Sequence, residues 1–356
     1  MAKKTLIVVH GMGQHTKTSV KSEVTTALTK AIKLYPSLGG KSASSLVTIK
    51  PVVYGNYFDD YRKSVSKESG SLSEKIKKVD ASNSLVTDSI SSVNRLGKRF
   101  GNDEFFYTHL LDVILYRYTL LSERIRLHVA EEIVTSIAKS GSANVHVLGH
   151  SLGTAVVHDT LQKTFGAENI LAPDNTELNL NTTEHRLGGI HMIANVSRVL
   201  QSFIKVGSSV VRPGKLGCTS AFYEYRHKLD PFTYVKPFEP TNNGGWVDQT
   251  TFKRAYRLVH DDLNEVTAAN VHSLEHYIAN PAVHLPLLDA LIAFSPKKAE
   301  RVAAEKQYLQ STVQGKARAV QEAFGTLSNG SNGSIKTLLQ AAQDLKELVA
   351  GFEEEF

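Results

Sequence analysis

The sequence predicts an α/β protein with a mostly parallel β-sheet flanked by helices. Short apolar segments rich in β-branched residues alternate with longer segments whose apolar residues recur at helical spacing. This alternation is typical of a parallel sheet with helices on both faces. Glycine-containing turns follow two of the predicted strands, at residues 10–13 and 149–153. Of the 356 residues, 41% are hydrophobic, an ordinary fraction for a chain with a sizeable core.

The predicted elements follow one another along the chain at spacings that suit such a sheet. Val20, Val24 and Leu28 share one face of the first predicted helix, which indicates an amphipathic element. Strands are predicted at residues 5–9, 46–54, 144–148, 190–196 and 222–226, with a weaker sixth candidate at 254–259. Helices are predicted at residues 19–35, at 105–140 with a break near Ser122, at 152–165 and at 273–279.

Two segments depart from the alternating pattern. The Ser- and Lys-rich stretch 64–99 has weak helical periodicity and is interpreted as a helical insertion at about residues 62–103. After Pro296, apolar stripes at 302–327 and 335–352 flank a Ser, Asn and Gly turn at 328–334, which predicts a helical hairpin. We therefore expect one α/β domain at 1–295 and a C-terminal helical hairpin at 296–356. The hairpin either packs on this domain or serves as a dimerisation or partner-binding arm.

Charge and targeting signals exclude several classes of protein. The formal net charge is +6, with Lys and Arg scattered apart from a denser stretch at residues 63–99. This pattern favours a solvated surface; the alternative is peripheral contact with an anionic membrane, and no nucleic-acid motif is present. The single cysteine, Cys218, cannot form a disulfide within the chain. Because no segment approaches the ~20 apolar residues of a membrane span and no signal-peptide core is present, we expect a cytoplasmic protein, with signal-independent export left open.

Residues 149–153 read Gly-His-Ser-Leu-Gly and fit the pattern G-x-S-x-G between a predicted strand and a predicted helix. In that context the serine occupies a tight turn that holds its hydroxyl clear of the sheet, and larger side chains at the two glycines would clash. The N-terminus of the following helix favours a developing oxyanion. Ser151 is therefore the candidate nucleophile; the alternative is a Gly-rich connection without chemistry.

A second motif, His10-Gly11-Met12-Gly13, directly follows the first predicted strand. Acyl transfer needs two backbone N–H donors directed at the oxyanion. We expect one from Leu152, after the nucleophile, and the other from Met12, where flanking glycines allow close approach of the backbone. Taken alone, the same residues are also compatible with an ordinary strand-to-helix turn.

A serine hydroxyl is a good nucleophile only when a base accepts its proton, and an acid side chain orients that base. In enzymes with the G-x-S-x-G motif, the acid follows the nucleophile along the chain and the base follows the acid. Asp230 comes after a predicted strand and before Pro231, so it is the candidate acid, with Asp261 and Asp262 as rivals. The histidines after Asp230 are His260, His272, His276 and His284. His272 directly precedes Ser273, a good helix N-cap, and is our candidate base. His276, in the first turn of that helix, is the alternative base.

These motifs, together with Asn270-Val271-His272-Ser273 before Tyr277, resemble bacterial α/β-hydrolases of the lipase and esterase type over roughly residues 5–290. The resemblance implies the α/β-hydrolase fold and a serine hydrolase that cleaves carboxylic esters through an acyl-enzyme, with Ser151, Asp230 and His272 as its triad. The basic stretch 64–99 and the apolar stretch 196–211, where such folds carry a lid, favour an acyl-lipid substrate over a soluble ester.

Several alternatives stay open. A thioesterase or amidase would use the same residues, and a non-catalytic scaffold would use the same fold to bind a protein partner. Homo-oligomerisation through the C-terminal hairpin is a further expectation. Because no metal-ligand cluster and no phosphate-binding loop appear, we expect no metal and no cofactor.

Overall fold

The structure is a computed structural model. It describes residues 3–58 without 12 and 14, residues 60 and 116, and 121–166, 178–197, 209–230, 233, 238, 256–259, 263, 265–267, 270–310 and 312. Within these residues the predicted α/β class is confirmed. Five parallel strands pair in the order β2-β1-β3-β4-β5, and β6 pairs in parallel with the outer side of β5. The strands are β1 (Thr5–Val9), β2 (Thr48–Val52), β3 (Val145–His150), β4 (Gly189–Ile193), β5 (Phe222–Tyr225) and β6 (Tyr256–Val259).

The strand order places a switch in chain direction between β1 and β3. From β1 the chain moves outward to β2, and it then crosses to β3 on the other side of β1. Val9 at the end of β1 is in register with Gly149 near the end of β3. In open α/β sheets, ligands bind at the carboxyl ends of the strands beside such a switch point. The turns that follow β1 and β3 therefore meet where a functional site is expected.

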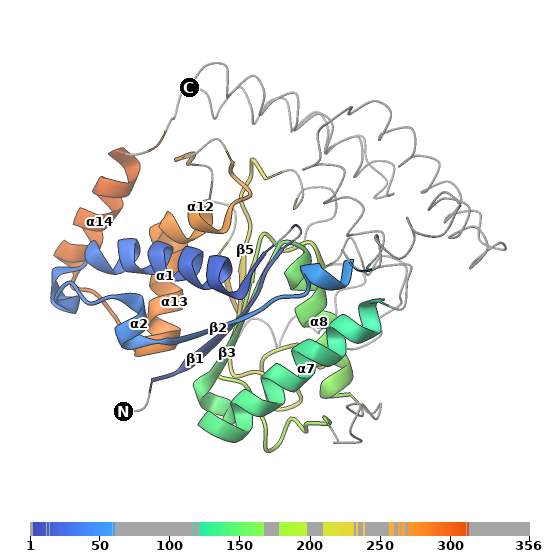
Figure 1. Ribbon diagram of the computed structural model, residues 1–356. Coiled ribbons are helices and arrows are strands. Elements are labelled where there is room, and N and C mark those ends of the chain that lie inside the picture. The colour runs from blue at the N-terminus through green and yellow to red at the C-terminus, as the bar shows by residue number, and fades with distance from the viewer. Residues whose placement is uncertain are drawn as a thin grey trace, which may run out of the picture.

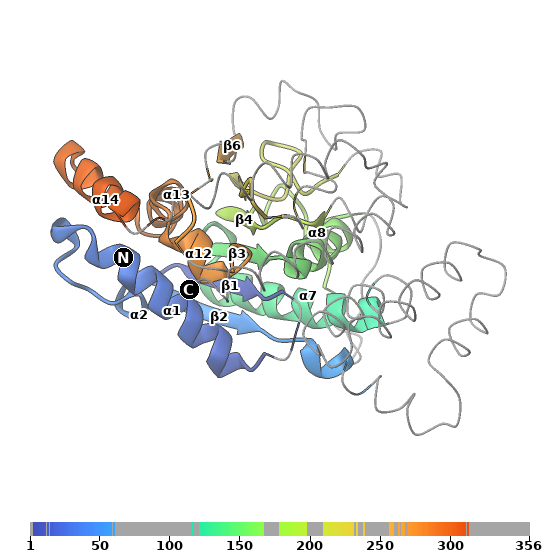
Figure 2. The same cartoon turned by 90° about the horizontal axis from the view of Figure 1, so that it is seen from above.

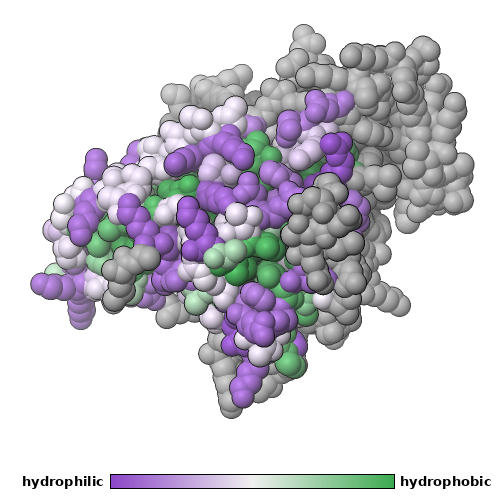
Figure 3. Space-filling model, turned by 60° about the horizontal axis from the view of Figure 1, so that its bottom comes forward, coloured by the Kyte–Doolittle hydropathy of each residue, from purple (hydrophilic) through white to green (hydrophobic). Residues whose placement is uncertain are grey.

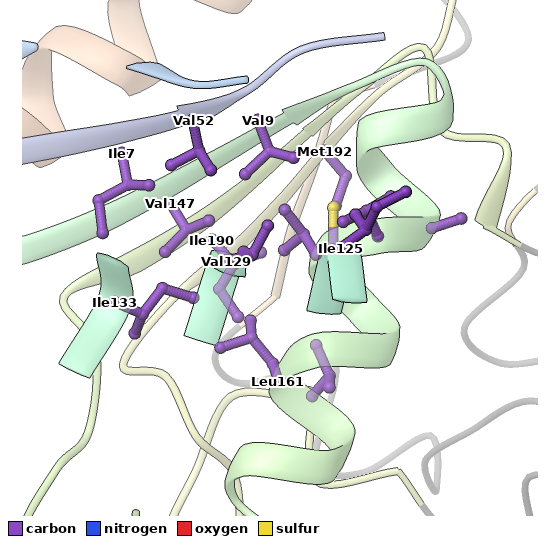
Figure 4. Close-up of a cluster of buried hydrophobic side chains, with 14 of the residues drawn as sticks. Ile7, Val9, Val52, Ile125, Val129, Ile133, Val147, Leu161, Ile190 and Met192 are labelled. Atoms are coloured by element: carbon purple, nitrogen blue, oxygen red, sulfur yellow. The ribbon is translucent and has the colours of Figure 1, made fainter. Parts of the chain in front are cut away.

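Helices cover both faces of the sheet (Figure 1). On one face, α7 (Leu121–Ser140) and α8 (Leu152–Thr164) pack their apolar sides on the strands. Figure 4 shows this core, in which Ile125 and Val129 of α7 and Leu161 of α8 point toward Val147 and Ile190 of the sheet. Burial of these aliphatic side chains supplies the main stabilising contribution, at about 1.5–3 kcal/mol for each one.

The opposite face is covered by α1 (Lys17–Lys33), α12 (Leu274–Ala279) and α13 (Pro281–Ile292). The short elements α2 (Ala43–Leu46) and η1 (Pro36–Leu38) connect α1 to β2, and η2 (Ser142–Asn144) connects α7 to β3. Helix α1 begins at a reciprocal capping box, in which Thr16 and Ser19 each bond the other's backbone N–H. Because α1 packs closely against α12, the helix after the predicted base is held against the rigid sheet layer.

Where the structure describes them, the predicted elements agree with the observed ones to within a few residues. Helix α7 begins at Leu121 and residues 117–120 lie outside the described residues, so the predicted break near Ser122 stays a prediction. The predicted insertion at 62–103 and the hairpin turn and second stripe at 328–352 lie outside the described residues.

The described part of the tail is α14 (Lys298–Gln310), which contacts α13 and lies on its outer side (Figure 2). Ala304 and Tyr308 are buried, and Tyr308 accepts a hydrogen bond from the Asn280 side chain. The predicted stripe residues Val302 and Leu309 are instead 53% and 46% exposed. The start of the tail therefore packs on the α/β domain, but through a different helix face from the one predicted.

On the face shown in Figure 3, the coloured residues at the surface are mostly hydrophilic, and hydrophobic residues reach the surface in a few separate areas. Among the helices that the structure describes, none is long and apolar enough to cross a membrane.

Candidate active site

Ser151 occupies a strained turn between β3 and α8. Its backbone has φ 53° and ψ −127°, a conformation that costs a non-glycine residue roughly 1–3 kcal/mol. The turn is closely packed, because a Cβ at Gly153 would lie only 2.2 Å from the carbonyl oxygen of Val9. A Cβ at Gly149 would lie 2.9 Å from the carbonyl oxygen of Gly153. Gly153 thus lets the turn press against the end of β1, and Gly149 lets the end of β3 approach the first turn of α8, while Ser151 keeps its unusual conformation.

Ser151, His272 and Asp230 form a continuous hydrogen-bonded chain. The distance from Ser151 Oγ to His272 Nε2 is 2.8 Å, and that from His272 Nδ1 to Asp230 Oδ2 is 2.7 Å. An ionised carboxylate can only accept, so His272 carries its proton on Nδ1 and Nε2 accepts from the serine hydroxyl. The three residues come from the ends of β3 and β5 and from the loop before α12, separated by 121 and 42 positions in sequence. The structure therefore brings together the three residues that the sequence analysis selected.

Asp230 lies in a turn that is built around the backbone and ring of His227. The N–H of Asp230 donates to the His227 carbonyl, and the N–H of Leu229 donates to His227 Nδ1. His227 Nε2 must then carry the ring proton, which it donates to the carbonyl of Glu265. Asp230 is fully buried, and burial alone would raise its pKa. The charge of His272 and hydrogen bonds from His272 and Tyr277 outweigh that effect and hold the pKa of Asp230 below its usual value.

His272 precedes α12 in a loop that its neighbours hold in place. Its backbone N–H donates to the Asn270 side chain, and Ser273 caps the helix by accepting from the N–H of His276. The side chain of His272 is 15% exposed, in contrast to the fully buried Asp230. The imidazole thus links a dry carboxylate to the buried serine hydroxyl, and part of its own surface remains exposed.

The alternative base, His276, is placed elsewhere. Its Nδ1 lies 2.9 Å from Thr267 Oγ1 and its ring packs edge-on against His227. Burial lowers the pKa of His276 to about 3, so it remains neutral. His284 is also buried and bonds Tyr35 and the carbonyl of Ile278. The remaining rivals, His260, Asp261 and Asp262, lie outside the described residues.

The turn after β1 lies directly beside the nucleophile. A Cβ at Gly11 would lie 2.9 Å from Ser151 Cβ. His10 holds this turn, because its ring stacks on Tyr54 and its Nε2 accepts from the Tyr54 N–H. The Tyr54 hydroxyl in turn donates to the His10 carbonyl at 2.7 Å. Burial lowers the pKa of His10 to about 3, so the ring is a neutral structural group.

Of the two predicted oxyanion donors, the structure describes Leu152 but not Met12. Leu152 is the first residue of α8, and the N–H groups of the first turn have no partner within their own helix. Its N–H therefore lies at the positive end of that helix, next to Ser151. Met12 lies outside the described residues, so its role stays a prediction.

Two residues of the site were not given a role by the sequence. His150, inside the motif, bonds the backbone of His272, and Tyr277 bonds Asp230. The motif places His150 beside the nucleophile, but no sequence signal indicates which distant atom its ring meets. Tyr277 lies in α12, five positions after His272. This short separation is the sequence feature that places it near the same site.

The site has the chemical elements for proton transfer from a serine hydroxyl to an imidazole that a buried carboxylate orients. Among the described residues, no three His, Cys, Asp or Glu side chains are grouped so that they could hold a metal ion. Fold and site together define an α/β protein with a serine–histidine–aspartate chain at the switch point of its parallel sheet. Comparisons with protein-family models, with curated proteins and with solved structures found no match to this chain.

Proposed function

We propose that this protein is a serine hydrolase of the α/β-hydrolase type that cleaves carboxylic esters through an acyl-enzyme. The observation that carries the proposal is the position of His272 between Ser151 Oγ and Asp230 Oδ2, at 2.8 and 2.7 Å. A chance cluster of polar groups would not also place the serine at φ 53° in a tight turn at the start of a helix.

In this proposal Ser151 Oγ attacks the carbonyl carbon of the ester while its proton moves to His272 Nε2. The imidazolium that forms is stabilised by Asp230, which stays ionised because its pKa is low. The proton then passes to the departing alcohol, and a water molecule that His272 activates releases the acid from Ser151. The N–H of Leu152, with that of Met12 as the second donor, would stabilise the negative oxygen of each tetrahedral intermediate.

Acyl lipid is the proposed substrate class, on the composition of the stretches 64–99 and 196–211. Thioesters and amides would undergo the same steps at the same residues, so they are the nearest alternative. A non-catalytic scaffold that binds a protein partner is the other alternative, and the complete serine–histidine–aspartate chain disfavours it.

The decisive experiment treats the purified full-length chain with a fluorophosphonate probe. We expect labelling of the wild type and none of Ser151→Ala. Ser136→Ala, which removes a hydroxyl from a buried serine of α7, is the matched control and should label normally. Labelling that persists in Ser151→Ala would contradict the assignment.

Substrate class is tested with the same three proteins. A chain-length series of p-nitrophenyl esters, an acyl thioester and a panel of neutral and anionic phospholipids would be compared by kcat/KM. Rates that rise with acyl length and are highest on phospholipid support the lipid assignment. A preference for short soluble esters or for the thioester would replace it.

A further inference from the structure

Two described residues donate hydrogen bonds to Asp230 Oδ2, and one of them is the base. His272 Nδ1 lies 2.7 Å from this oxygen, and the Tyr277 hydroxyl donates to the same oxygen at 2.8 Å. Tyr277 is 1% exposed and Asp230 is fully buried. Two donors therefore compete for the negative charge of one carboxylate oxygen in a dry environment, where such bonds are stronger than in water.

The direction of the Tyr277 hydroxyl is determined by a third group. The backbone N–H of His227 donates to Tyr277 Oη at 3.0 Å. Because that contact uses a lone pair of the phenol oxygen, the phenol hydrogen is free to point at Asp230. His227 is also the residue whose carbonyl and ring organise the turn that carries Asp230. Tyr277 thus ties the acid to the turn that holds it and to the helix that follows the base.

We propose that Tyr277 is a positioning residue that fixes the orientation of Asp230 and limits the negative charge that Asp230 presents to His272. The inference rests on the proposed function, since the pair it tunes is the proposed acid and base. With the phenol hydroxyl removed, Oδ2 directs more of its charge at His272. The imidazolium that forms in the reaction is then better stabilised, so the acid limb of the pH–rate profile should lie at higher pH than in wild type.

The matched control is Tyr35, whose hydroxyl is also buried and also donates a single hydrogen bond. Tyr35 Oη lies 2.7 Å from His284 Nε2, and His284 Nδ1 is occupied as donor to the carbonyl of Ile278. Tyr35→Phe therefore removes the same atom and one donated hydrogen bond from the core, away from Asp230, whereas Tyr277→Phe also removes the acceptor of the His227 N–H. Any difference between Tyr277→Phe and Tyr35→Phe reports on the site and not on the loss of a buried hydroxyl.

The experiment measures kcat and KM of full-length wild type, Tyr277→Phe and Tyr35→Phe between pH 5 and 9. For Tyr277→Phe we expect kcat to fall about tenfold with KM little changed, because Asp230 loses the bond that fixes its orientation behind His272. The acid limb of kcat/KM should move up by about half a pH unit, because the Tyr277 bond withdraws only part of the charge that Asp230 presents to His272. Tyr35→Phe should leave both quantities at the wild-type value. An unmoved acid limb in Tyr277→Phe would overturn the proposal.

A second variant distinguishes a change in hydrogen-bond strength from a folding defect. Site-specific replacement of Tyr277 by 3-fluorotyrosine keeps the ring and the hydroxyl and makes the hydroxyl a stronger donor. The acid limb should then move in the opposite direction, to lower pH. A shift to higher pH, or none, would contradict the proposed role.

A readout without turnover separates this inference from the proposed function. The proton on His272 Nδ1 should give a downfield ¹H resonance, which Tyr277→Phe moves further downfield and Tyr35→Phe leaves in place. Absence of probe labelling and ester turnover in the wild type would reject the proposed function. An identical resonance in wild type and Tyr277→Phe would reject the role of Tyr277, whatever the activity.

Discussion

His150 Nε2 lies 2.8 Å from the backbone carbonyl oxygen of His272, so the residue before the nucleophile holds the main chain of the base. A carbonyl only accepts, and His150 therefore carries its ring proton on Nε2. Burial, reinforced by the nearby charge of His272, lowers the pKa of His150 to about 3, so this donor is retained throughout the neutral range. The contact links the end of β3 directly to the loop before α12.

We expect His150→Leu to impair catalysis by loosening that loop. The change replaces the ring and its donor with an apolar side chain of similar size. Misplacement of a catalytic group by ~1 Å can lower kcat about 100-fold. His150→Gln places an amide N–H near the position of Nε2 and should keep kcat within a few-fold of wild type. Steady-state kinetics on one soluble ester checks both. Equal loss in the two variants would show that the ring itself, and not its hydrogen bond, is required.

The sequence analysis selected Ser151, Asp230 and His272 because their signals are local. A strand, a pair of glycines and a helix start mark Ser151, and Ser273 marks the end of the loop that carries His272. The contacts of His150 and Tyr277 are not local. His150 meets a carbonyl 122 positions away, and Tyr277 meets a carboxylate 47 positions away. The packing of β3, β5 and α12 determines which atoms these side chains contact. The spacing of residues in the sequence does not predict that packing.

The tail shows a different limit of sequence periodicity. The predicted stripe counted only large apolar residues, and it selected Val302 and Leu309. The face of α14 that packs on the domain instead uses Ala304 and Tyr308, which bury well because one is small and the other finds a polar partner in Asn280. An aliphatic stripe therefore identifies the helix but not the side of it that meets the core.

Gly153→Ala should be strongly destabilising, because a Cβ there would lie 2.2 Å from one backbone carbonyl oxygen and 2.4 Å from the next, those of Val9 and His10. Backbone atoms of a central strand cannot move aside easily, so we expect a loss of about 3 kcal/mol or more in the free energy of unfolding. Gly39→Ala is the control, since its φ is 62° and nothing lies within 4 Å. Gly39→Ala should lower the free energy of unfolding by only about 1 kcal/mol, because alanine is disfavoured in the left-handed backbone conformation. Urea unfolding followed by circular dichroism compares the two.

The two histidines four positions apart should differ sharply in their effect on turnover. His272→Ala removes the group that contacts both Ser151 and Asp230, and loss of a triad base lowers kcat by several powers of ten. His276→Ala removes a buried ring that contacts Thr267 and His227, which should cost about 1–3 kcal/mol of stability. It should retain at least about a tenth of wild-type kcat when assayed well below its melting temperature. The reverse ranking, with both variants folded, would move the proposed base to His276.

Buried histidines should make the protein sensitive to mild acid. His146 in β3 and His191 in β4 lie on the same face of the sheet, and His191 stacks on Tyr223. Neither ring nitrogen of His146 has a hydrogen-bond partner among the described residues. Burial, and to a lesser extent the charge of Lys4, lowers the pKa of His146 to about 4, and burial lowers the pKa of His191 well below its ordinary value.

The sign of the pH dependence follows from which state binds protons. Between pH 6.5, the ordinary pKa of histidine, and about 4, the unfolded chain binds protons at these two positions and the folded chain does not. The free energy of unfolding should therefore be highest above pH 6.5 and fall as the pH decreases to about 4. Each such histidine contributes a slope of up to about 1.4 kcal/mol per pH unit.

His146→Leu tests this relation at a single position. Leucine has a similar volume and no ring nitrogen to leave unpaired, so the variant should be at least as stable as wild type at neutral pH. The slope of unfolding free energy against pH should be lower than in wild type by up to about 1.4 kcal/mol per pH unit between pH 4.5 and 6. Urea titrations at half-unit pH steps from 4.5 to 8 give both slopes. Parallel slopes in the two proteins would mean that His146 binds its proton equally well when folded, and that this position plays no part in any acid sensitivity of the fold.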